Sequence, residues 1–560
     1  MALGAAALLL SRGVGAQQPL VPASPLSDYV RFLELQGKAR QTPLVYWASS
    51  TAPSAGGLVV DSAHLWADRY ALATRAATTR RFALRILDSQ SDIVYNSGFP
   101  RTVNDGAAWG GRGLSATVRG GADVTWGPFT GRLYPTVVYA QNRAFPLGTG
   151  PASPGSPYAY PWNADIDLPQ RFGESAMRRF DWGQSELRVD LKAFTAALST
   201  ENLWWGPGTR NAIIMGSAAP GFAHLDIGTG RPLRSAIGDF EVRGTYGELR
   251  RSPFAAARDA NARRIFTGLT VGYRPSFLPG LTVGAARALY RRWPVGGPGL
   301  EDVKRPFGTL LNWGTKRLED GSVGNDLDDQ LASVVARWVL PAARVEVYLE
   351  YARNDFAGDL RDLLTEPDHA RGYTAGLQKV LDGDAAAGRW VLRAENTNLG
   401  QTRTEVVRGG GAFYTHGLVR EGYTHRGQLL GAPIGPGSNA QFLGLDRYAA
   451  DGRFGVFVER IRYDDDYAFP ANRGKGAEGG FLNHQLDLTA GASWLHFGTV
   501  FDVGGNVEVT RQWNRYYRLR NDLTNLRLGL TLGWHERTLG AHSTVVPPLG
   551  GTAPQRVPTH

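Results

Sequence analysis

Aromatic residues beside charged or amide side chains are the clearest groups in this 560-residue sequence that could bind a ligand. Sugar rings present apolar C–H faces that stack on Trp and Tyr, while their hydroxyl groups form hydrogen bonds with Arg, Asn and Asp. The same aromatic residues could instead pack inside a barrel or at a membrane interface. The candidate carbohydrate-binding residues are Asn104, Asp105, Trp109 and Arg112 in one region, Tyr158, Tyr160 and Trp162 in a second, and Trp204, Trp205 and Arg210 in a third.

Motifs for catalysis or cofactor binding are much less specific. Two stretches, Gly111–Ala116 and Gly435–Ala440, fit the loose pattern Gly-x-Gly-x-x-Ala of dinucleotide sites. That chemistry needs a helix that begins at the glycines and holds a pyrophosphate at its N-terminus. The first stretch instead leads into strand-like sequence and the second lies in a Gly- and Pro-rich loop, so we predict no cofactor. A glycosidase needs two carboxylates about 5–10 Å apart, and the sequence leaves that alternative open.

Metal binding is also weakly indicated. The chain contains no cysteine, which excludes disulfides, thiolate metal sites and Cys nucleophiles. His416 and His425 each end a Tyr-Thr-His tripeptide, but they lack the spacing of two ligands on one helical face. Acidic clusters at 326–329 and 464–466 lack the glycine and the terminal Glu of an EF-hand. We therefore predict no metal, and interpret these groups as strand or loop histidines and solvated loop acids.

Segments of alternating polarity must position the candidate residues. From about residue 114 onward, segments of about ten residues alternate apolar and polar side chains. In Leu526–Trp534 every second residue is Leu or Trp, and the residues between them are Arg, Gly or Thr. The stretches 501–512 and 344–351 follow the same pattern. Such strands have one face suited to lipid or a protein core and one suited to water.

Connections between these segments are alternately short and long. Short turns at 340–343, 450–452 and 497–498 predict hairpins. Long polar or Gly- and Pro-rich connections lie at 143–172, 294–328, 355–371 and 464–482. Outer-membrane barrels combine short periplasmic turns with long extracellular loops in this way.

The pattern predicts an all-β fold, a large antiparallel transmembrane β-barrel with a small N-terminal, periplasmic helical element. At about 23 residues per strand and connection, the alternating part holds on the order of 18 strands, an even number as in bacterial single-chain barrels. A β-propeller or a pair of β-sandwiches would be the soluble alternatives. No signature recurs every 40–50 residues or so, as a propeller requires. No apolar run beyond residue 20 reaches the roughly 18 residues of a transmembrane helix.

The two ends of the chain differ from the alternating part. Residues 1–16 resemble a signal peptide that ends at Val14-Gly15-Ala16, although no positive charge precedes the apolar run and an ordinary helix is the alternative. Residues 17–110 are expected to form an N-terminal region of short helices and first strands, in which Ser27 could cap a helix that ends at Gly37. The barrel is expected at 111–535, followed by a C-terminal tail at 536–560.

The formal net charge is +10, and the basic residues are mostly arginine. Such a charge fits a polyanionic partner, which could be nucleic acid, anionic lipid or acidic polysaccharide. The arginines are scattered over the alternating segments and form no continuous basic run of the kind that binds nucleic acid. We therefore predict no nucleic-acid partner, and a compositional preference for arginine is the simpler explanation of the charge.

Five stretches of the sequence resemble the capsule-assembly Wzi family. One is Glu201–Gly208, which contains a Trp-Trp-Gly-Pro signature and is followed by Asn211–Met215. The others are Asn104–Gly113, Ile166–Gly173, Asp181–Ser185 and Gly422–Gly427.

The resemblance implies an outer-membrane barrel with helical elements at its periplasmic end. It further implies a surface lectin without catalytic activity, which helps to assemble or anchor capsular or extracellular polysaccharide. The expected partners are that polysaccharide, outer-membrane lipids and polysaccharide export machinery. The identity of the sugar does not follow from the resemblance. A porin or uptake channel would need the same strands and is the main alternative, and an exported glycan-cleaving enzyme is the second.

Overall fold

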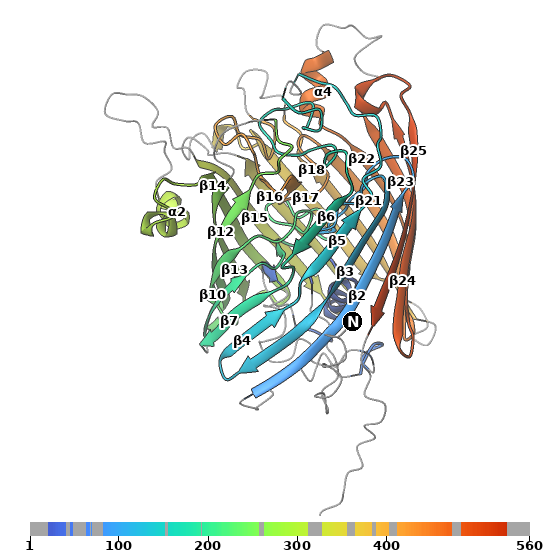
Figure 1. Ribbon diagram of the computed structural model, residues 1–560. Helices are drawn as coiled ribbons and strands as arrows, with labels where there is room; N and C mark the ends of the chain where they lie inside the picture. The colour runs from blue at the N-terminus through green and yellow to red at the C-terminus, as the bar shows by residue number, and fades with distance from the viewer. Residues whose placement is uncertain are drawn as a thin grey trace, which may run out of the picture.

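The alternating segments form a closed antiparallel barrel of 18 strands (Figure 1). The computed structural model describes residues 21–40, 45–48, 63–67, 69, 82–151, 155–191, 193–256, 263–311, 328–354, 364–382, 388–402, 411–472 and 483–534. The predicted signal peptide at 1–16 and the predicted tail at 536–560 therefore lie outside the described residues.

The strands follow one another around the barrel in chain order. Their bounds are β2 (Phe82–Asn96), β3 (Gly113–Trp126), β4 (Phe129–Leu133), β5 (Thr136–Ala140), β6 (Met177–Asp181), β7 (Glu186–Leu191), β8 (Phe194–Ser199), β10 (His224–Thr229), β11 (Leu233–Ser235), β12 (Gly238–Arg250), β13 (Arg263–Pro275), β14 (Leu281–Arg292), β15 (Asp328–Leu340), β16 (Val345–Asn354), β17 (Arg371–Val380), β18 (Arg389–Asn398), β21 (Asn439–Ala449), β22 (Gly452–Arg462), β23 (Leu486–Phe497), β24 (Phe501–Trp513) and β25 (Leu523–Trp534). β4 with β5, β6 with β7, and β10 with β11 are each one interrupted strand, because both parts lie against the same neighbours.

β2 and β25 close the barrel, with Ser89 opposite Trp534 and Asn96 opposite Arg527. The first barrel strand thus begins at Phe82, before the boundary at residue 111 that the sequence suggested for the barrel. Alternation is hard to recognise in β2 because the register against β3 shifts between Leu87 and Gln90.

Apolar side chains point out of the barrel and polar ones point in. On β25, Leu526, Leu528 and Leu530 are 37%, 41% and 39% exposed, whereas Asn525 and Arg527 are buried. Soluble proteins show the opposite arrangement, so the outer surface of the wall suits lipid.

Connections divide the barrel into two ends. Short turns join strands at the turn end, including the three that the sequence predicted: β15 to β16, β21 to β22, and β23 to β24. The opposite loop end carries the long connections, and the predicted loops 143–172, 294–328, 355–371 and 464–482 all belong to it. Both ends of the barrel-forming part, at Phe82 and Trp534, lie at the turn end (Figure 1).

Three of the long connections fold back into the lumen and form a plug with an apolar core. Its fully buried residues include Ile166 between β5 and β6, Ile213 and Met215 between β8 and β10, and Tyr414 and Leu430 between β18 and β21. Two small sheets organise it: β9 (Leu203–Trp205) pairs with β1 (Tyr46–Ala48) of the N-terminal region, and β19 (Thr424–His425) pairs with β20 (Gln428–Leu429).

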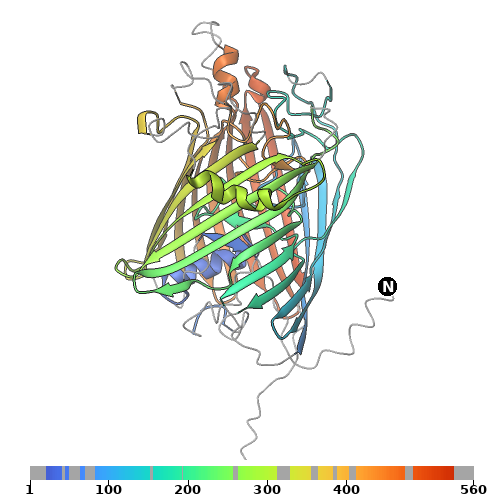
Figure 2. The same cartoon turned by 90° about the vertical axis from the view of Figure 1, so that its left-hand side faces the viewer.

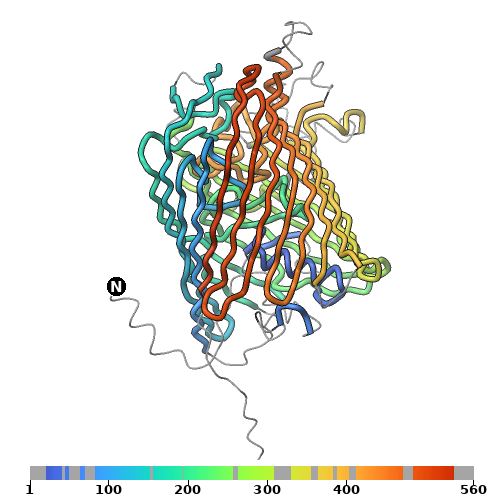
Figure 3. The backbone as a smooth tube through the Cα atoms, turned by 90° about the vertical axis from the view of Figure 1, so that its right-hand side faces the viewer, coloured from blue at the N-terminus to red at the C-terminus, as the bar shows by residue number. Residues whose placement is uncertain are grey.

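Helix α1 (Pro25–Leu35) lies inside the barrel near the turn end (Figure 3). Ser24 caps it, with Ser27 completing a capping box at the third helical position, so the expectation that Ser27 is the cap is wrong. Ionic contacts hold the helix to the inner wall, because Arg31 lies 2.5 Å from Glu346 and Glu34 lies 2.6 Å from Arg337. Among the described residues, no helix is long and apolar enough to cross a membrane.

Candidate functional site

Aromatic side chains from three connections, two long and one short, meet at the loop end, and we call them the mouth cluster. Its members are Tyr160 and Trp162 between β5 and β6, Tyr467 in α4 (Asp465–Asn472), and Tyr516 and Tyr517 in the short helix η4 (Arg515–Tyr517). Trp162 stacks on Tyr467 with ring centroids 4.6 Å apart, and Tyr517 meets Trp162 edge-on at 5.2 Å. The rings are partly exposed and so retain surface for a ligand.

Hydroxyl groups of the mouth cluster tie the connections together. Tyr160 donates a hydrogen bond to Asp464 over 2.5 Å, and Tyr516 donates one to the carbonyl of Pro146 over 2.6 Å. Burial raises the pKa of Asp464 to about 6, against the opposing effect of the Tyr160 hydrogen bond. The cluster is therefore held in place before any ligand arrives.

The backbone around η4 is strained. Asn514, Tyr516, Tyr517 and Arg520 have φ values of 50°, 58°, 55° and 61°. Left-handed backbone is uncommon for residues with a β-carbon, and such strain persists where surrounding contacts enforce it, often at functional sites. Here Asp522 accepts a hydrogen bond from the Asn514 amide, and Asn514 accepts one from the Arg520 amide.

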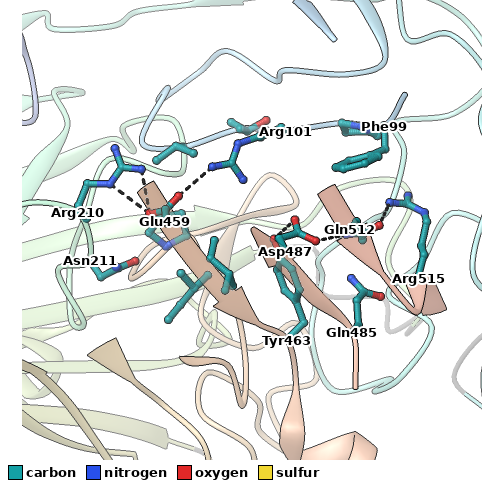
Figure 4. Close-up of a pocket in the computed structure, with 16 residues that line it drawn as sticks. Phe99, Arg101, Arg210, Asn211, Glu459, Tyr463, Gln485, Asp487, Gln512 and Arg515 are labelled. Carbon is teal, nitrogen blue, oxygen red and sulfur yellow. Dashed lines mark hydrogen bonds and ion pairs between the residues drawn. The ribbon is translucent and has the colours of Figure 1, made fainter. Parts of the chain in front are cut away.

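A polar cavity of about 260 Å³ lies next to the mouth cluster, between the plug and the inner wall. Figure 4 shows the side chains that line it. We call it the lumenal cavity. Its charged and amide side chains are Arg101, Arg210, Asn211, Glu459, Gln485, Asp487, Gln512 and Arg515, and Phe99 and Tyr463 add aromatic rings.

Ion pairs fix one side of the lumenal cavity. Arg101 and Arg210 both lie 2.9 Å from Glu459, one on each carboxylate oxygen. Arg101 also lies 3.1 Å from Glu508 on β24. These charge-assisted contacts hold both guanidinium groups at the cavity surface.

The other side of the lumenal cavity is a chain of hydrogen bonds. Asp487 accepts from Tyr463 at 3.0 Å and from Gln512 at 2.6 Å. Arg515 in turn donates to Gln512 over 2.5 Å. Among the described residues, two buried polar atoms of the lining find no hydrogen-bond partner: Asn211 Oδ1 and Arg515 Nε. Such atoms are costly to bury, so a ligand hydroxyl or water at this surface would be stabilised.

The cavity and the mouth cluster are continuous. The guanidinium of Arg515 lies 4.8 Å from the ring centroid of Phe99 and 4.6 Å from that of Tyr516. Tyr463 lines the cavity, and its carbonyl accepts a hydrogen bond from Tyr517. A chain of sugar rings on the mouth cluster would therefore have polar groups next to it.

The sequence matches the family of the capsule assembly protein Wzi over residues 97–524. This chain belongs to the Wzi family. It is accordingly an outer-membrane β-barrel. Because such barrels carry their long connections on the extracellular side, we expect the loop end to face the outside of the cell.

Wzi of Escherichia coli, an outer membrane protein involved in group 1 capsule assembly and a carbohydrate-binding β-barrel, has a similar fold, with a TM-score of 0.57 and 13% sequence identity over 93% of this chain and 99% of that one. OccAB2 of Acinetobacter baumannii is a more distant barrel, with a TM-score of 0.39 and 11% identity over 81% of this chain and 98% of that one. OprB of Pseudomonas putida has a TM-score of 0.36 and 13% identity over 86% and 99%. No curated protein sequence matches the chain.

The Wzi-like sequence stretches supply much of the plug core, and Asn211 of one stretch also lines the lumenal cavity. The Trp205 amide donates a hydrogen bond to the carbonyl of Met215. A β-carbon on Gly427 would come within 3.0 Å of Pro169, so these two stretches also lie against each other. The sequence motifs of the family therefore belong mainly to the plug inside this barrel. They do not by themselves point to a ligand.

Three predicted carbohydrate-binding aromatics lie in the interior and offer almost no surface to a ligand. Trp205 is 0% exposed, and Trp109 and Trp204 are each 6% exposed. The indole of Trp205 lies against β13, where a β-carbon on Gly268 would come within 2.4 Å of it. For these residues the structure favours packing over sugar binding, because a barrel with a solid plug needs large apolar groups inside.

The remaining predicted carbohydrate-binding residues lie in different parts of the structure. Tyr160, Trp162 and Arg210 come together at the mouth cluster and the lumenal cavity. Asn104 and Asp105 line a second cavity of about 380 Å³, which extends along the wall to residues 21–25 near the turn end.

Arg112 and Tyr158 form contacts between loops. Arg112 donates to the carbonyls of Ser97 and Ala144, and Tyr158 donates to Glu174 over 3.1 Å.

Several residues of the site were not predicted from the sequence, chiefly Arg101, Tyr467, Arg515, Tyr516 and Tyr517. A usable signal was the paired tyrosine after Asn514-Arg515, in a short connection between two strongly alternating strands. The two tripeptide histidines serve other roles, since His416 accepts from the Val419 amide and His425 from the Arg250 amide. The described residues contain no group of three or more acidic or histidine side chains placed to hold a metal ion.

Proposed function

We propose that this Wzi-family barrel binds capsular or extracellular polysaccharide at its loop end and helps to hold it on the cell surface. One observation carries the proposal: aromatic rings from three loops form a fixed cluster next to a lumenal cavity lined by arginine, carboxylate and amide groups. Tyr and Trp stack on sugar rings, and the polar groups recognise hydroxyl or acidic substituents. The role requires binding alone and no catalytic group.

Deletion of the gene tests the proposal, with the polymer quantified separately as cell-attached and culture-released material. Wild-type cells should keep the polymer attached. The deletion strain should make the same total amount but release more of it, and the wild-type gene should restore attachment. Unchanged attachment in the deletion strain would refute the proposal. A fall in total polymer would instead indicate a role in synthesis or in the export machinery.

The second cavity gives the channel alternative a specific basis. It lies between the plug and strands β2, β24 and β25, and polar residues such as Asp92, Arg119 and Arg527 line it. The apolar plug nevertheless fills part of the lumen and packs against inward-facing wall residues such as Phe266 and Leu331. Purified protein in planar bilayers should therefore show little steady conductance beside an open porin of similar strand number, and robust conductance would favour the channel.

A further inference from the structure

Helix α2 (Leu300–Leu311) lies outside the barrel, against the wall formed by β12, β13 and β14 (Figure 2). Tyr246 of β12 donates a hydrogen bond to the carbonyl of Val303, and Arg287 of β14 donates one to the carbonyl of Pro306. Outward-facing Ile265 and Leu269 of β13 are each only 5% exposed, whereas outward leucines on β25 are about 40% exposed. The helix therefore covers part of the surface that elsewhere suits lipid.

The polarity of α2 is reversed relative to a helix on a soluble protein. Its buried Asp302 faces the wall, where Arg291 and Arg305 contact the carboxylate and the Gly299 amide donates to it. The opposite face carries three exposed apolar residues in one stripe, Leu300, Val303 and Phe307, at 77%, 45% and 49% exposure. A stripe at positions i, i+3 and i+7 that points away from the protein needs an apolar surrounding, as for helices that lie in a membrane interface.

The height of α2 on the barrel agrees with such a surrounding. Tyr246, which holds the helix, is on the outer face near the loop end. Outward tyrosines at the loop-end part of other strands are Tyr95, Tyr139, Tyr351 and Tyr373. Aromatic residues of this kind mark the level of the lipid head groups in outer-membrane barrels. The apolar stripe thus lies at the acyl boundary of the outer leaflet.

Positive charge accumulates beside the stripe. Arg250 and Arg263 share one carboxylate, Glu248, at 2.8 Å and 2.7 Å. Arg291 and Arg305 likewise share Asp302. The Arg250 and Arg263 pair therefore exceeds Glu248 by one positive charge, and about half of each of these two side chains is exposed, at 58% and 48%. Pairs of guanidinium groups suit phosphate recognition.

We propose that α2 and the loop-end parts of β12 and β13 form a binding site for a phosphorylated lipid of the outer leaflet. The acyl chains lie along Leu300, Val303 and Phe307, and the head-group phosphate contacts Arg250, Arg263 and Lys304. Lys304 is 69% exposed and lies 3.3 Å from Glu301 on the same helix. The site is on the outside of the wall and does not depend on the proposed polysaccharide function. It would anchor this barrel laterally to the lipid that surrounds it.

Native mass spectrometry of the detergent-purified full chain tests this site, with diphosphorylated lipid A and phosphatidylcholine as the two probes. We expect wild-type protein to retain lipid A, whose two phosphates leave a net negative charge, at least tenfold more strongly than phosphatidylcholine, whose phosphate is balanced by choline. The preference should fall at high salt. The triple variant Arg250→Ala/Arg263→Ala/Lys304→Ala should lose most of that preference. The triple variant Leu300→Ser/Val303→Ser/Phe307→Ser should bind both lipids more weakly.

A matched control is Arg274→Ala, which removes an arginine paired with Asp239 at the turn end and should leave lipid retention unchanged. Folding of each variant is verified by its heat-dependent shift in gel electrophoresis. Equal retention of both lipids by the wild type would overturn the proposal, as would α2 variants that behave like the control. A wild-type dimer that the serine variant converts to monomer would also overturn it, because a second copy would then cover the stripe.

Discussion

Trp162 and Tyr467 stack with their ring centroids 4.6 Å apart and their planes 29° from parallel, although they come from different loops. Tyr517, from a third loop, lies 5.2 Å from each of them. One ligand on this cluster would contact all three loops at once. The mouth cluster is therefore the part of the molecule in which a local side-chain change should affect binding without disturbing the barrel.

The first prediction concerns that cluster. Trp162→Ala and Tyr517→Ala should each weaken polysaccharide binding by roughly 2- to 10-fold, since an aromatic contact contributes about 0.5–1.5 kcal/mol beyond its buried area. Binding of the purified polymer to detergent-solubilised protein measures this effect. Trp182→Ala is the matched control, because Trp182 is 56% exposed but lies outside the mouth cluster. An equal loss of polysaccharide binding in all three variants would contradict the assignment of the mouth cluster as the binding surface.

The second prediction concerns the plug. Trp205→Ala should lower the free energy of unfolding by about 3–5 kcal/mol, because it leaves a cavity in a core where the indole is fully buried. Trp205→Phe should lower the free energy of unfolding by less, since a phenyl ring fills part of the space of the indole. The denaturant midpoint, followed by heat-dependent gel mobility, compares the two. A normal midpoint together with a loss of polysaccharide binding would show that Trp205 contacts the ligand after all.

The barrel could be predicted from the sequence because its signal is local. Strands such as Leu526–Trp534 alternate without interruption, and turns such as 340–343 are short. β2 is the exception, since the register shift between Leu87 and Gln90 breaks its period. Likewise Ser24 and Ser27 both resemble a helix cap, and only the backbone geometry distinguishes them.

The candidate site was harder to predict because long-range contacts assemble it. Trp162 and Trp205 have similar sequence surroundings, each close to proline and to polar residues, yet one lies at the mouth and the other in the plug. Their positions depend on which connections fold into the lumen, and the alternation of apolar and polar residues does not predict this. Arg101 and Arg515 carry no local signal, because their partners Glu508 and Phe99 lie at the opposite end of the sequence.

The third prediction concerns Arg101, which bridges Glu459 and Glu508 at 2.9 Å and 3.1 Å. Arg101→Met should lower the free energy of unfolding by about 3–5 kcal/mol, because removing one partner leaves buried carboxylates short of positive charge. Adding Glu459→Gln should recover part of that loss. The denaturant midpoints of the single and double variants measure this coupling. Strictly additive effects would mean that the two side chains act independently.

The last prediction concerns pH and Asp464, because burial raises the pKa of its carboxyl group from the usual 3.8 to about 6. The folded chain binds this proton more tightly than the unfolded chain. The contribution of protonated Asp464 to the free energy of unfolding is therefore complete below about pH 4 and is lost as pH rises through 6. Asp464→Asn has no proton to lose and still offers Tyr160 a carbonyl acceptor.

The difference in unfolding midpoint between wild type and Asp464→Asn should therefore change between pH 4.5 and pH 7.5, with the wild type relatively weaker at the higher pH. Comparing the two proteins at each pH removes the contributions of the other titrating groups. Asp382→Asn, at an aspartate that is 88% exposed at the turn end, provides the control for the loss of a carboxylate. A constant difference at both pH values would mean that Asp464 titrates alike in the folded and unfolded chains, and that burial beneath Tyr160 does not set its charge.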